Sequence, residues 1–339
     1  MNVRRLIPTT ALAGAVALGL VSLSACAGTS DAADKGSSGK LDVVASFYPM
    51  QYLAEQIGGG HVAVDTLTKP GVEPHDLELK PRQIGELGEA DVILYLKGIQ
   101  PAVDDAIAQA GVENTVDAAT LTKLEAHGTE VGHEHGTEEH SGEEHSDEEH
   151  AAEEAGHEGH DHGSEAGTDP HIWLDPVKYA EVAKGVGTAL EKADPANAAD
   201  YKENTDALVK KLGDLNTEFE TGLKTTTTRT FITTHSAFGY LAERYGLEQE
   251  GITGIDPESE PSPARIKELQ DIAEKDKVST VFFETLASDK TAKTLAGDTG
   301  LKTDVLDPLE GITDKSKGDD YIEVMQSNLA ALKKALGAK

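Results

Sequence analysis

The stretch Thr168–Pro176, with the sequence TDPHIWLDP, separates two very different parts of the chain. It follows a run of residues rich in His, Glu and Gly, and the part of the chain after it has regular apolar patterns. Pro170 and Pro176 bias the residues before them toward extended or turn geometry. Trp173, the only Trp of the protein, follows His171 by two positions. We interpret this stretch as a fixed loop that aims one imidazole at one point, and we expect that point to be a metal ion.

On both sides of this stretch, short apolar strands alternate with helical segments. The expected extended segments are 41–47, 61–67, 90–96, 112–116, 229–233, 247–253, 278–284 and 301–306. Residues 90–96 are nearly all apolar, which is typical of a strand buried on both faces of a parallel sheet. The alternation predicts an α/β fold with parallel sheets and helices on both faces. Ligands of such sheets bind beyond the carboxyl ends of the strands.

One segment predicts a helix longer than the others. Asp194-Pro195 is typical of a helix start, and apolar residues recur at helical spacing as far as Leu223. A helix over this segment would be about 42 Å long, which suits a strut between two lobes. We therefore expect an N-terminal lobe over 41–193, a linker helix over 194–224 and a C-terminal lobe over 225–339.

The N-terminus reads as a secretory signal over residues 1–25. Arg4 and Arg5 precede an apolar stretch over 11–23 that is short for a membrane span. The segment ends in Leu-Ser-Ala-Cys26, which resembles the lipobox of bacterial lipoproteins. We expect Cys26 to carry the lipid, residues 26–40 to form a flexible tether, and the protein to be anchored to the outer face of the bacterial cell membrane. The alternative is an ordinary signal peptide that ends near a Cys. Cys26 is the only Cys, so a disulfide within the chain is impossible.

Charge and composition narrow the possible partners. The net charge of −31 argues against nucleic-acid binding, which needs a basic surface.

Residues 124–167 contain no Lys or Arg and little apolar periodicity, which predicts disorder. Imidazoles and carboxylates both ligate zinc, so we interpret this insert as a weak auxiliary metal collector rather than merely a solvated acidic segment. Its histidines are His127, His133, His135, His140, His145, His150, His157, His160 and His162.

The remaining histidines define the candidate main site. His75, His171 and His235 lie in loops with tight turn chemistry, whereas His61 begins a strand and is expected to have no such role. Asp307 follows the last expected strand, and three imidazoles with one carboxylate suit Zn²⁺. Glu284, or a water, is the alternative to Asp307. A fourth protein ligand would leave no position for an activated water, which favours metal capture over catalysis. The sequence contains no H-E-x-x-H, G-x-S-x-G, P-loop or G-x-G-x-x-G motif.

Several motifs together resemble a known family. They are the lipobox, Glu73-Pro74-His75-Asp76, the His-rich insert, Asp169-Pro170-His171-Ile172-Trp173, Thr234-His235-Ser236-Ala237-Phe238 and Leu306-Asp307-Pro308-Leu309. In this order they are similar to the substrate-binding lipoproteins of zinc and manganese ABC importers, the ZnuA-like group. The resemblance covers essentially the whole mature chain.

This resemblance implies two four-stranded parallel-sheet lobes joined by one long helix, with the metal between the lobes. It implies His75, His171, His235 and Asp307 as ligands, Zn²⁺ as the transported ion, and an ABC permease as partner of a monomeric binding protein. His235 favours zinc, because manganese binders of the group tend to carry Glu there. The alternatives are a manganese binder of the same fold, an extracellular zinc hydrolase with a three-His site, and a surface adhesin or zinc store without a transporter.

Overall fold

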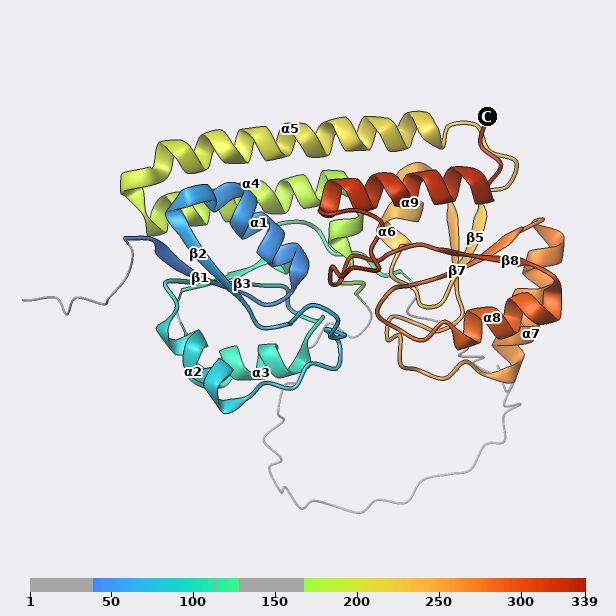
Figure 1. The fold of residues 1–339 in the computed structure, drawn as a ribbon, viewed down its shortest axis with the longest axis horizontal. Helices are drawn as coiled ribbons and strands as arrows, with labels where there is room; N and C mark the ends of the chain where they lie inside the picture. The colour runs from blue at the N-terminus through green and yellow to red at the C-terminus, as the bar shows by residue number, and fades with distance from the viewer. Residues whose placement is uncertain (1–38, 113, 128–167) are drawn as a thin grey trace, which may run out of the picture. The chain divides into compact units, whose positions relative to one another are not determined.

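Two parallel sheets of four strands each form the framework of the chain (Figure 1). The computed structural model describes residues 39–112, 114–127 and 168–339. The first sheet has the order β2-β1-β3-β4 and the second the order β6-β5-β7-β8, with all neighbouring strands parallel. The strands are β1 (Leu41–Ala45), β2 (Val62–Thr66), β3 (Val92–Tyr95), β4 (Thr115–Asp117), β5 (Thr230–Thr233), β6 (Glu248–Gly251), β7 (Thr280–Phe283) and β8 (Lys302–Val305). The predicted α/β class with two four-stranded parallel sheets is confirmed.

Helices cover both faces of each sheet (Figure 1). The α-helices are α1 (Tyr48–Gly58), α2 (Pro81–Glu89), α3 (Pro101–Ala110), α4 (Pro176–Ala193), α5 (Ala198–Gly222), α6 (Gly239–Tyr245), α7 (Pro263–Lys275), α8 (Lys290–Thr299) and α9 (Tyr321–Ala335). Short 3-10 turns are η1 (Gly59–His61), η2 (Ala118–Thr120), η3 (Ile172–Leu174) and η4 (Pro195–Asn197). Helices α2 and α3 pack on one face of the first sheet, and α7 and α8 pack on one face of the second.

The inner strands β1, β3 and β7 are apolar on successive residues because both of their faces are buried. Val43 and Ala45 of β1 face a large core shared with α1, α4, α5 and α9, whereas Val44 between them faces the core under α2 and α3. In β7, Phe282 faces the shared core and Val281 the core under α7 and α8. Side chains alternate across a strand, so one apolar run serves two cores. The shared core therefore joins the two sheets.

The long helix α5 begins after η4 and runs for 25 residues. It packs against α1 and α4 on the side of the first sheet and against α9 on the side of the second (Figure 1). At 1.5 Å per residue its length is about 37 Å, close to the expectation for a helix that joins two lobes. Asp194 does not cap α5, because the 3-10 turn at Pro195–Asn197 intervenes; its Oδ2 accepts hydrogen bonds from Nδ2 of Asn197 (2.7 Å) and Oη of Tyr201 (2.9 Å).

Some predictions lie outside the described residues. These are the signal peptide over 1–25, the lipidated Cys26, most of the tether over 26–40, and all histidines of the insert except His127. Residues 124–127 of the predicted disordered insert are described, and they form neither helix nor strand. Among the described helices, none has both the length and the apolar character that a membrane span requires.

The close packing of α4 against α5 can be tested by substitution of a glycine. A Cβ added to Gly187 of α4 would overlap Oγ1 of the buried Thr205 on α5 and lie 3.0 Å from its Cγ2. We expect Gly187→Ala to lower the free energy of unfolding by about 1–3 kcal/mol, because overpacking outweighs the gain in helix propensity. Chemical denaturation in the presence of a chelator measures the change.

Gly213 of α5 provides the matched control, since a Cβ there has no heavy atom within 4 Å. Gly213→Ala should raise the free energy of unfolding by about 0.5–1 kcal/mol through helix propensity alone. Equal stabilisation by both substitutions would contradict the close approach of α4 and α5.

Candidate metal centre

Four loops each contribute one side chain to a common point. His75 lies between β2 and α2, and His171 is the residue before η3. His235 follows β5, and Glu310 lies in the loop after β8. This is the carboxyl-end edge where parallel sheets place ligands. The three histidines that the sequence singled out are thus brought together from both sheets.

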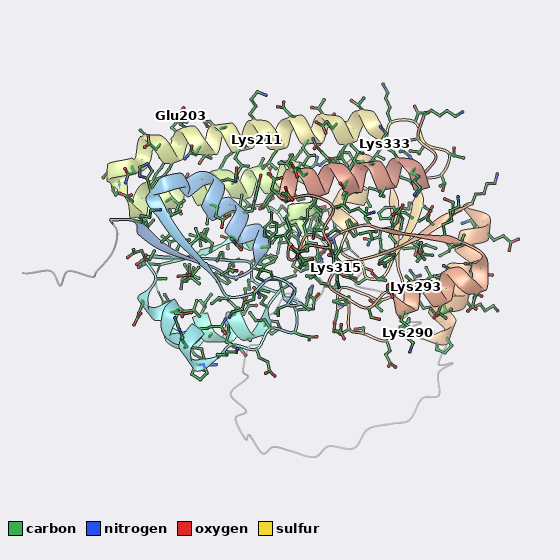
Figure 2. The ribbon with its side chains drawn as sticks, in the orientation of Figure 1. Glu203, Lys211, Lys290, Lys293, Lys315 and Lys333 are labelled. Carbon is green, nitrogen blue, oxygen red and sulfur yellow. The ribbon has the colours of Figure 1, made fainter. Side chains whose placement is uncertain are left out.

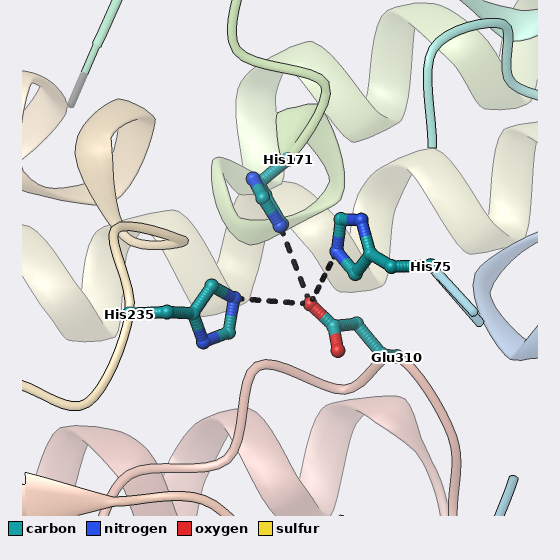
Figure 3. Close-up of side chains that lie close together, drawn as sticks. All are labelled: His75, His171, His235 and Glu310. Carbon is teal, nitrogen blue, oxygen red and sulfur yellow. Dashed lines mark ion pairs between the residues drawn. The ribbon is translucent and has the colours of Figure 1, made fainter. Parts of the chain in front are cut away.

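The inward atoms of these side chains surround one position (Figure 3). Oε1 of Glu310 lies 3.3 Å from Nε2 of His171, 3.3 Å from Nε2 of His235 and 3.5 Å from Nε2 of His75. All four potential ligand atoms lie within 4.8 Å of one another. His171, His235 and Glu310 are at most 1% exposed, and the side chain of His75 is 11% exposed.

These inward atoms lack other partners. Within the described part of the chain, neither the three Nε2 atoms nor the two oxygens of Glu310 make a hydrogen bond. Buried polar groups are normally hydrogen-bonded, so five such atoms in one place need an explanation. In a tetrahedral zinc site with bonds of about 2.0–2.1 Å, ligand atoms are about 3.3–3.4 Å apart. The observed separations from Oε1 match the edges of that tetrahedron and are long for hydrogen bonds.

Carboxylates on the outer side fix the orientation of two rings. Nδ1 of His171 lies 2.7 Å from Oδ1 of Asp169, and Nδ1 of His235 lies 2.9 Å from Oε1 of Glu284. With Nδ1–H donating to the carboxylate, the lone pair of each Nε2 points to the centre, which is how metal-binding imidazoles are usually held. Asp169 and Glu284 therefore act as positioning residues. Glu284, the alternative to Asp307 as a ligand, contacts His235 from behind.

The buried imidazoles and carboxylates of the centre shift one another's pKa values. Burial lowers the pKa of His171, but the hydrogen bond to Asp169 and the nearby charges of Asp169 and Glu310 outweigh burial and raise it. The pKa of His235 is raised well above its ordinary value because Glu284 and Glu310 likewise outweigh burial. Burial raises the pKa of Glu310, but the imidazoles prevail and hold it well below the usual range. Burial and the charge of Glu310 raise the pKa of Glu73 to about 9, so Glu73 is neutral at pH 7.

Asp307 is not the carboxylate that the structure brings to the three imidazoles. Its Oδ1 accepts a hydrogen bond from the backbone N of Leu309 (2.9 Å), and its Oδ2 accepts one from Oγ1 of Thr285 (3.1 Å). Leu309 has a φ of 57°, in the left-handed region that costs energy for a residue with a Cβ. Asp307 supports this turn, and the turn carries Glu310 to the centre. We predicted Asp307 as the fourth ligand. In the structure its carboxylate is engaged in this turn, and Glu310, three residues later, lies beside the three imidazoles instead.

Glu310 was missed because four carboxylates within or next to these loops, Glu73, Glu284, Asp307 and Glu310, fit the same chemistry. One signal was available: Glu310 lies three residues after Asp307, in the same loop between β8 and α9. Nothing in spacing alone separates a turn-forming Asp from a ligand Glu in such a short segment. His61, which we set aside, lies away from the centre and pairs with Asp200 (2.8 Å).

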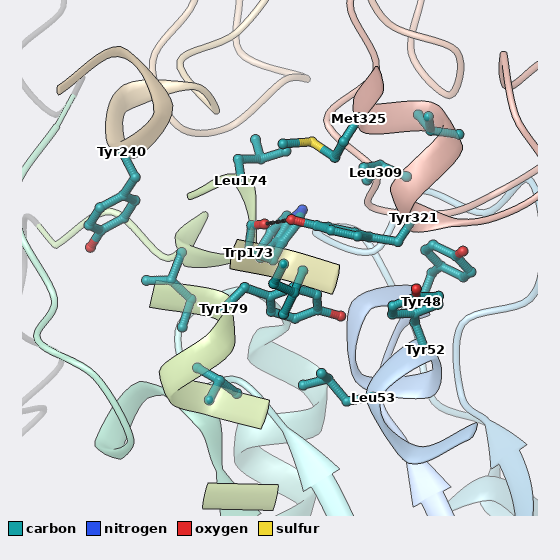
Figure 4. Close-up of a cluster of buried hydrophobic side chains, with 14 of the residues drawn as sticks. Tyr48, Tyr52, Leu53, Trp173, Leu174, Tyr179, Tyr240, Leu309, Tyr321 and Met325 are labelled. Carbon is teal, nitrogen blue, oxygen red and sulfur yellow. Dashed lines mark hydrogen bonds between the residues drawn. The ribbon is translucent and has the colours of Figure 1, made fainter. Parts of the chain in front are cut away.

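A buried aromatic cluster holds the loops in place (Figure 4). Nε1 of Trp173 donates to the carbonyl of Pro308 (2.7 Å), and Oη of Tyr321 donates to the carbonyl of Trp173 (2.6 Å). The ring of Trp173 also lies 5.1 Å from the ring of His171. Trp173 therefore packs against His171, in line with the expectation of a fixed loop, and it also joins this loop directly to the loop that carries Glu310.

Of the auxiliary histidines, only His127 is described. It is half-buried beside Asp169 and Glu243 and takes no part in the centre of Figure 3. Weak metal binding by His133, His135, His140, His145, His150, His157, His160 and His162 stays a prediction, because they lie outside the described residues.

The chain is similar to known zinc-binding proteins. The chain is 36% identical to the high-affinity zinc uptake system protein ZnuA of Bacillus subtilis over 324 residues, which cover 94% of each chain. It is 33% identical to the zinc-binding lipoprotein AdcA of Streptococcus pneumoniae over 306 residues, 88% of this chain and 56% of AdcA. The chain thus spans about half the length of AdcA.

Solved structures show the same fold. The crystal structure of the Zn(II)-bound ZnuA-like domain of Streptococcus pneumoniae AdcA superposes with a TM-score of 0.67 at 30% identity, covering 88% of this chain and 99% of that domain. These proteins are named for zinc binding and uptake, in line with the expectation of a binding protein rather than an enzyme. A family model described as zinc-uptake complex component A, periplasmic, matches residues 43–335. The chain belongs to this ZnuA family of zinc-uptake components.

Proposed function

We propose that this protein is the extracytoplasmic zinc-capturing component of a zinc ABC importer. It binds Zn²⁺ with His75, His171, His235 and Glu310 and delivers the ion to a membrane permease. Membership of the family and the names of the similar proteins support the zinc assignment. Attachment to the membrane through a lipid on Cys26 belongs to the same proposal.

One observation carries the proposal: four buried ligand atoms face one point without hydrogen bonds, and Oε1 of Glu310 lies 3.3–3.5 Å from the three Nε2 atoms, close to the edge length of a tetrahedral zinc site. Three imidazoles and one carboxylate favour zinc, whereas manganese sites use more oxygen ligands. Four protein ligands leave no coordination position for a reactive water, which a zinc hydrolase would need. The arrangement is suited to holding the ion.

The side chain of His75 is the most exposed of the four, and its loop carries the edge of the site that solvent reaches. Within the described chain, His75 also lacks the carboxylate partner at Nδ1 that His171 and His235 have. We infer that the ion enters and leaves on the side of His75, because this ring is held least.

Substitution of the two candidate carboxylates distinguishes the ligand from the turn residue. Glu310→Ala should weaken Zn²⁺ affinity by more than about 100-fold, since it removes a ligand, as should Ala at any of the three histidines. Asp307→Asn should cost less than about tenfold, because Oδ1 of Asn still accepts from the N–H of Leu309. Competition with a fluorescent zinc chelator measures both. A larger loss for Asp307→Asn than for Glu310→Ala would contradict the assignment of Glu310.

Zinc affinity should depend on pH in a defined direction. The pKa values of His171 and His235 are raised, so protons occupy Nε2 already above the ordinary His value of about 6.5. Zn²⁺ must displace these protons, so affinity falls as pH falls through the raised pKa values.

Stability of the metal-free protein changes in the opposite direction. Pairing of the protonated imidazoles with Glu310 stabilises the metal-free fold fully below about pH 6.5 and is lost as pH rises through the raised pKa values. The rise in melting temperature on zinc addition should therefore be large at about pH 8 and small at about pH 5.5. Equal rises at both values, measured by scanning calorimetry, would count against ligation by these imidazoles.

A further inference from the structure

The segment that carries His75, residues 68–80, is here called the His75 loop. Within the described chain, every hydrogen bond made by residues 69–79 joins two residues of that segment, and none leaves it. Residues 69–72 are exposed, whereas Leu77 is buried in the core under α2 and α3. The loop is therefore held by its two ends and by one apolar side chain.

The other two histidines lie on loops that are tied near the histidine itself. The carbonyl of His235 accepts hydrogen bonds from Oγ1 of Thr233 (2.7 Å) and from Nε2 of Gln249 (3.1 Å). Trp173 ties the loop of His171 to the loop of the fourth ligand. The position of the third imidazole therefore depends more strongly on how the ends of its loop are held.

The side-chain amide of Gln83, in the first turn of α2, joins the two ends of the His75 loop. Its Nε2 donates to the carbonyl of Leu67 (2.8 Å), and its Oε1 accepts from the backbone N of Lys80 (3.1 Å). Gln83 is half-buried, and Leu67 is 2% exposed. An amide suits this position because one end of the group must donate while the other end accepts.

The first end of the loop is fixed to the first sheet. N and Oγ1 of Thr68 both donate to the carbonyl of Ser46, at 3.2 and 2.8 Å, and Nε2 of Gln100 donates to Oγ1 of Thr68 (2.8 Å). Thr68 and Gln100 are 6% and 2% exposed, so this network is buried. At the other end, Lys80 leads into α2. Gln83 therefore ties the start of α2 to the fixed end of the loop.

We propose that Gln83 is a positioning residue for zinc: by clamping both ends of the His75 loop, it keeps the imidazole of His75 at the centre and slows release of the ion. The proposal rests on the function proposed above. It assigns control of release to a residue outside the group of ligands. Without the clamp, the loop moves away from the centre more often, and the dissociation rate rises while the association rate changes little.

Two substitutions separate the clamp from the helix cap. In Gln83→Glu, the carboxylate still accepts from the N of Lys80, which keeps the cap of α2, but it cannot donate to the carbonyl of Leu67. Gln83→Leu loses both hydrogen bonds. We expect zinc release to be about 3–10-fold faster in both variants, the range that loss of one hydrogen bond can produce. Gln83→Leu should lower the metal-free melting temperature more than Gln83→Glu, because it also removes the cap.

Release is measured by stopped flow with the full chain. Protein loaded with less than one equivalent of Zn²⁺, so that only the tightest site is occupied, is mixed with excess fluorescent zinc chelator. The chelator concentration is raised until the rate no longer depends on it. Release from Gln83→Glu at the rate of the parent would overturn the clamp. Faster release from Gln83→Leu alone would do the same, because the effect would then come from the helix cap.

Gln326→Glu is the matched control. Nε2 of Gln326 on α9 donates to Oε2 of Glu218 on α5 (3.1 Å) at an exposed position, so the same substitution removes a donor and adds a charge outside the His75 loop. Exposed contacts of this kind contribute little, so this variant should release zinc within about twofold of the rate of the parent. A change as large as that in Gln83→Glu would assign the effect to charge and contradict the clamp.

A double-mutant cycle tests whether Gln83 acts through His75. In the His75→Ala background, Gln83→Glu should change zinc affinity and release by less than about twofold, whereas in the His235→Ala background it should keep its full effect. Equal effects in both backgrounds would overturn the clamp, because the substitution would then act on the whole fold. If the parent itself bound no zinc tightly, the proposed function would fail instead.

Discussion

Three imidazoles and a carboxylate, buried with their inward atoms unpaired, impose the constraint on which the rest of the site depends. A buried polar group without a hydrogen bond costs about 1–3 kcal/mol, and the centre contains five such atoms. Zinc binding is worth about 10–16 kcal/mol in structural sites, enough to offset several of them. A zinc ion bound as proposed would therefore complete an arrangement that the metal-free fold holds only at a cost.

The fold can hold these unpaired atoms together because packing, and not the metal, fixes the loops that carry them. Trp173 is fully buried and bonded to the carbonyl of Pro308, and Tyr321 is bonded to the carbonyl of Trp173. Tyr179, whose ring lies 4.7 Å from that of Tyr321, donates to the carbonyl of Pro49 after β1. The aromatic cluster thus links the loops of both sheets in one core, and the ligands are preorganised before the ion arrives. Preorganisation of this kind reduces the entropy lost on binding.

Much of the fold and part of the site could be predicted from the sequence, because the apolar residues of the strands and helices recur in regular patterns. Runs such as 90–96 are nearly all apolar because both faces of the strand are buried, so the α/β class and the location of His235 and Asp307 just beyond strand ends could be predicted. His171 could be singled out by its two prolines and the only Trp. The choice between Asp307 and Glu310 as the fourth ligand could not be predicted. It depends on the left-handed turn at Leu309, which local sequence preferences do not indicate for a leucine. The pairing of Glu284 with His235 likewise appears only in three dimensions.

The most direct measurement is the crystal structure of the zinc-loaded protein, with the ion located by anomalous scattering at the zinc edge. The account predicts one strong anomalous peak bonded to Nε2 of His75, His171 and His235 and to a carboxylate oxygen of Glu310, at about 2.0–2.2 Å. A peak bonded to Asp307 in place of Glu310, or lying outside the three imidazoles, would contradict it.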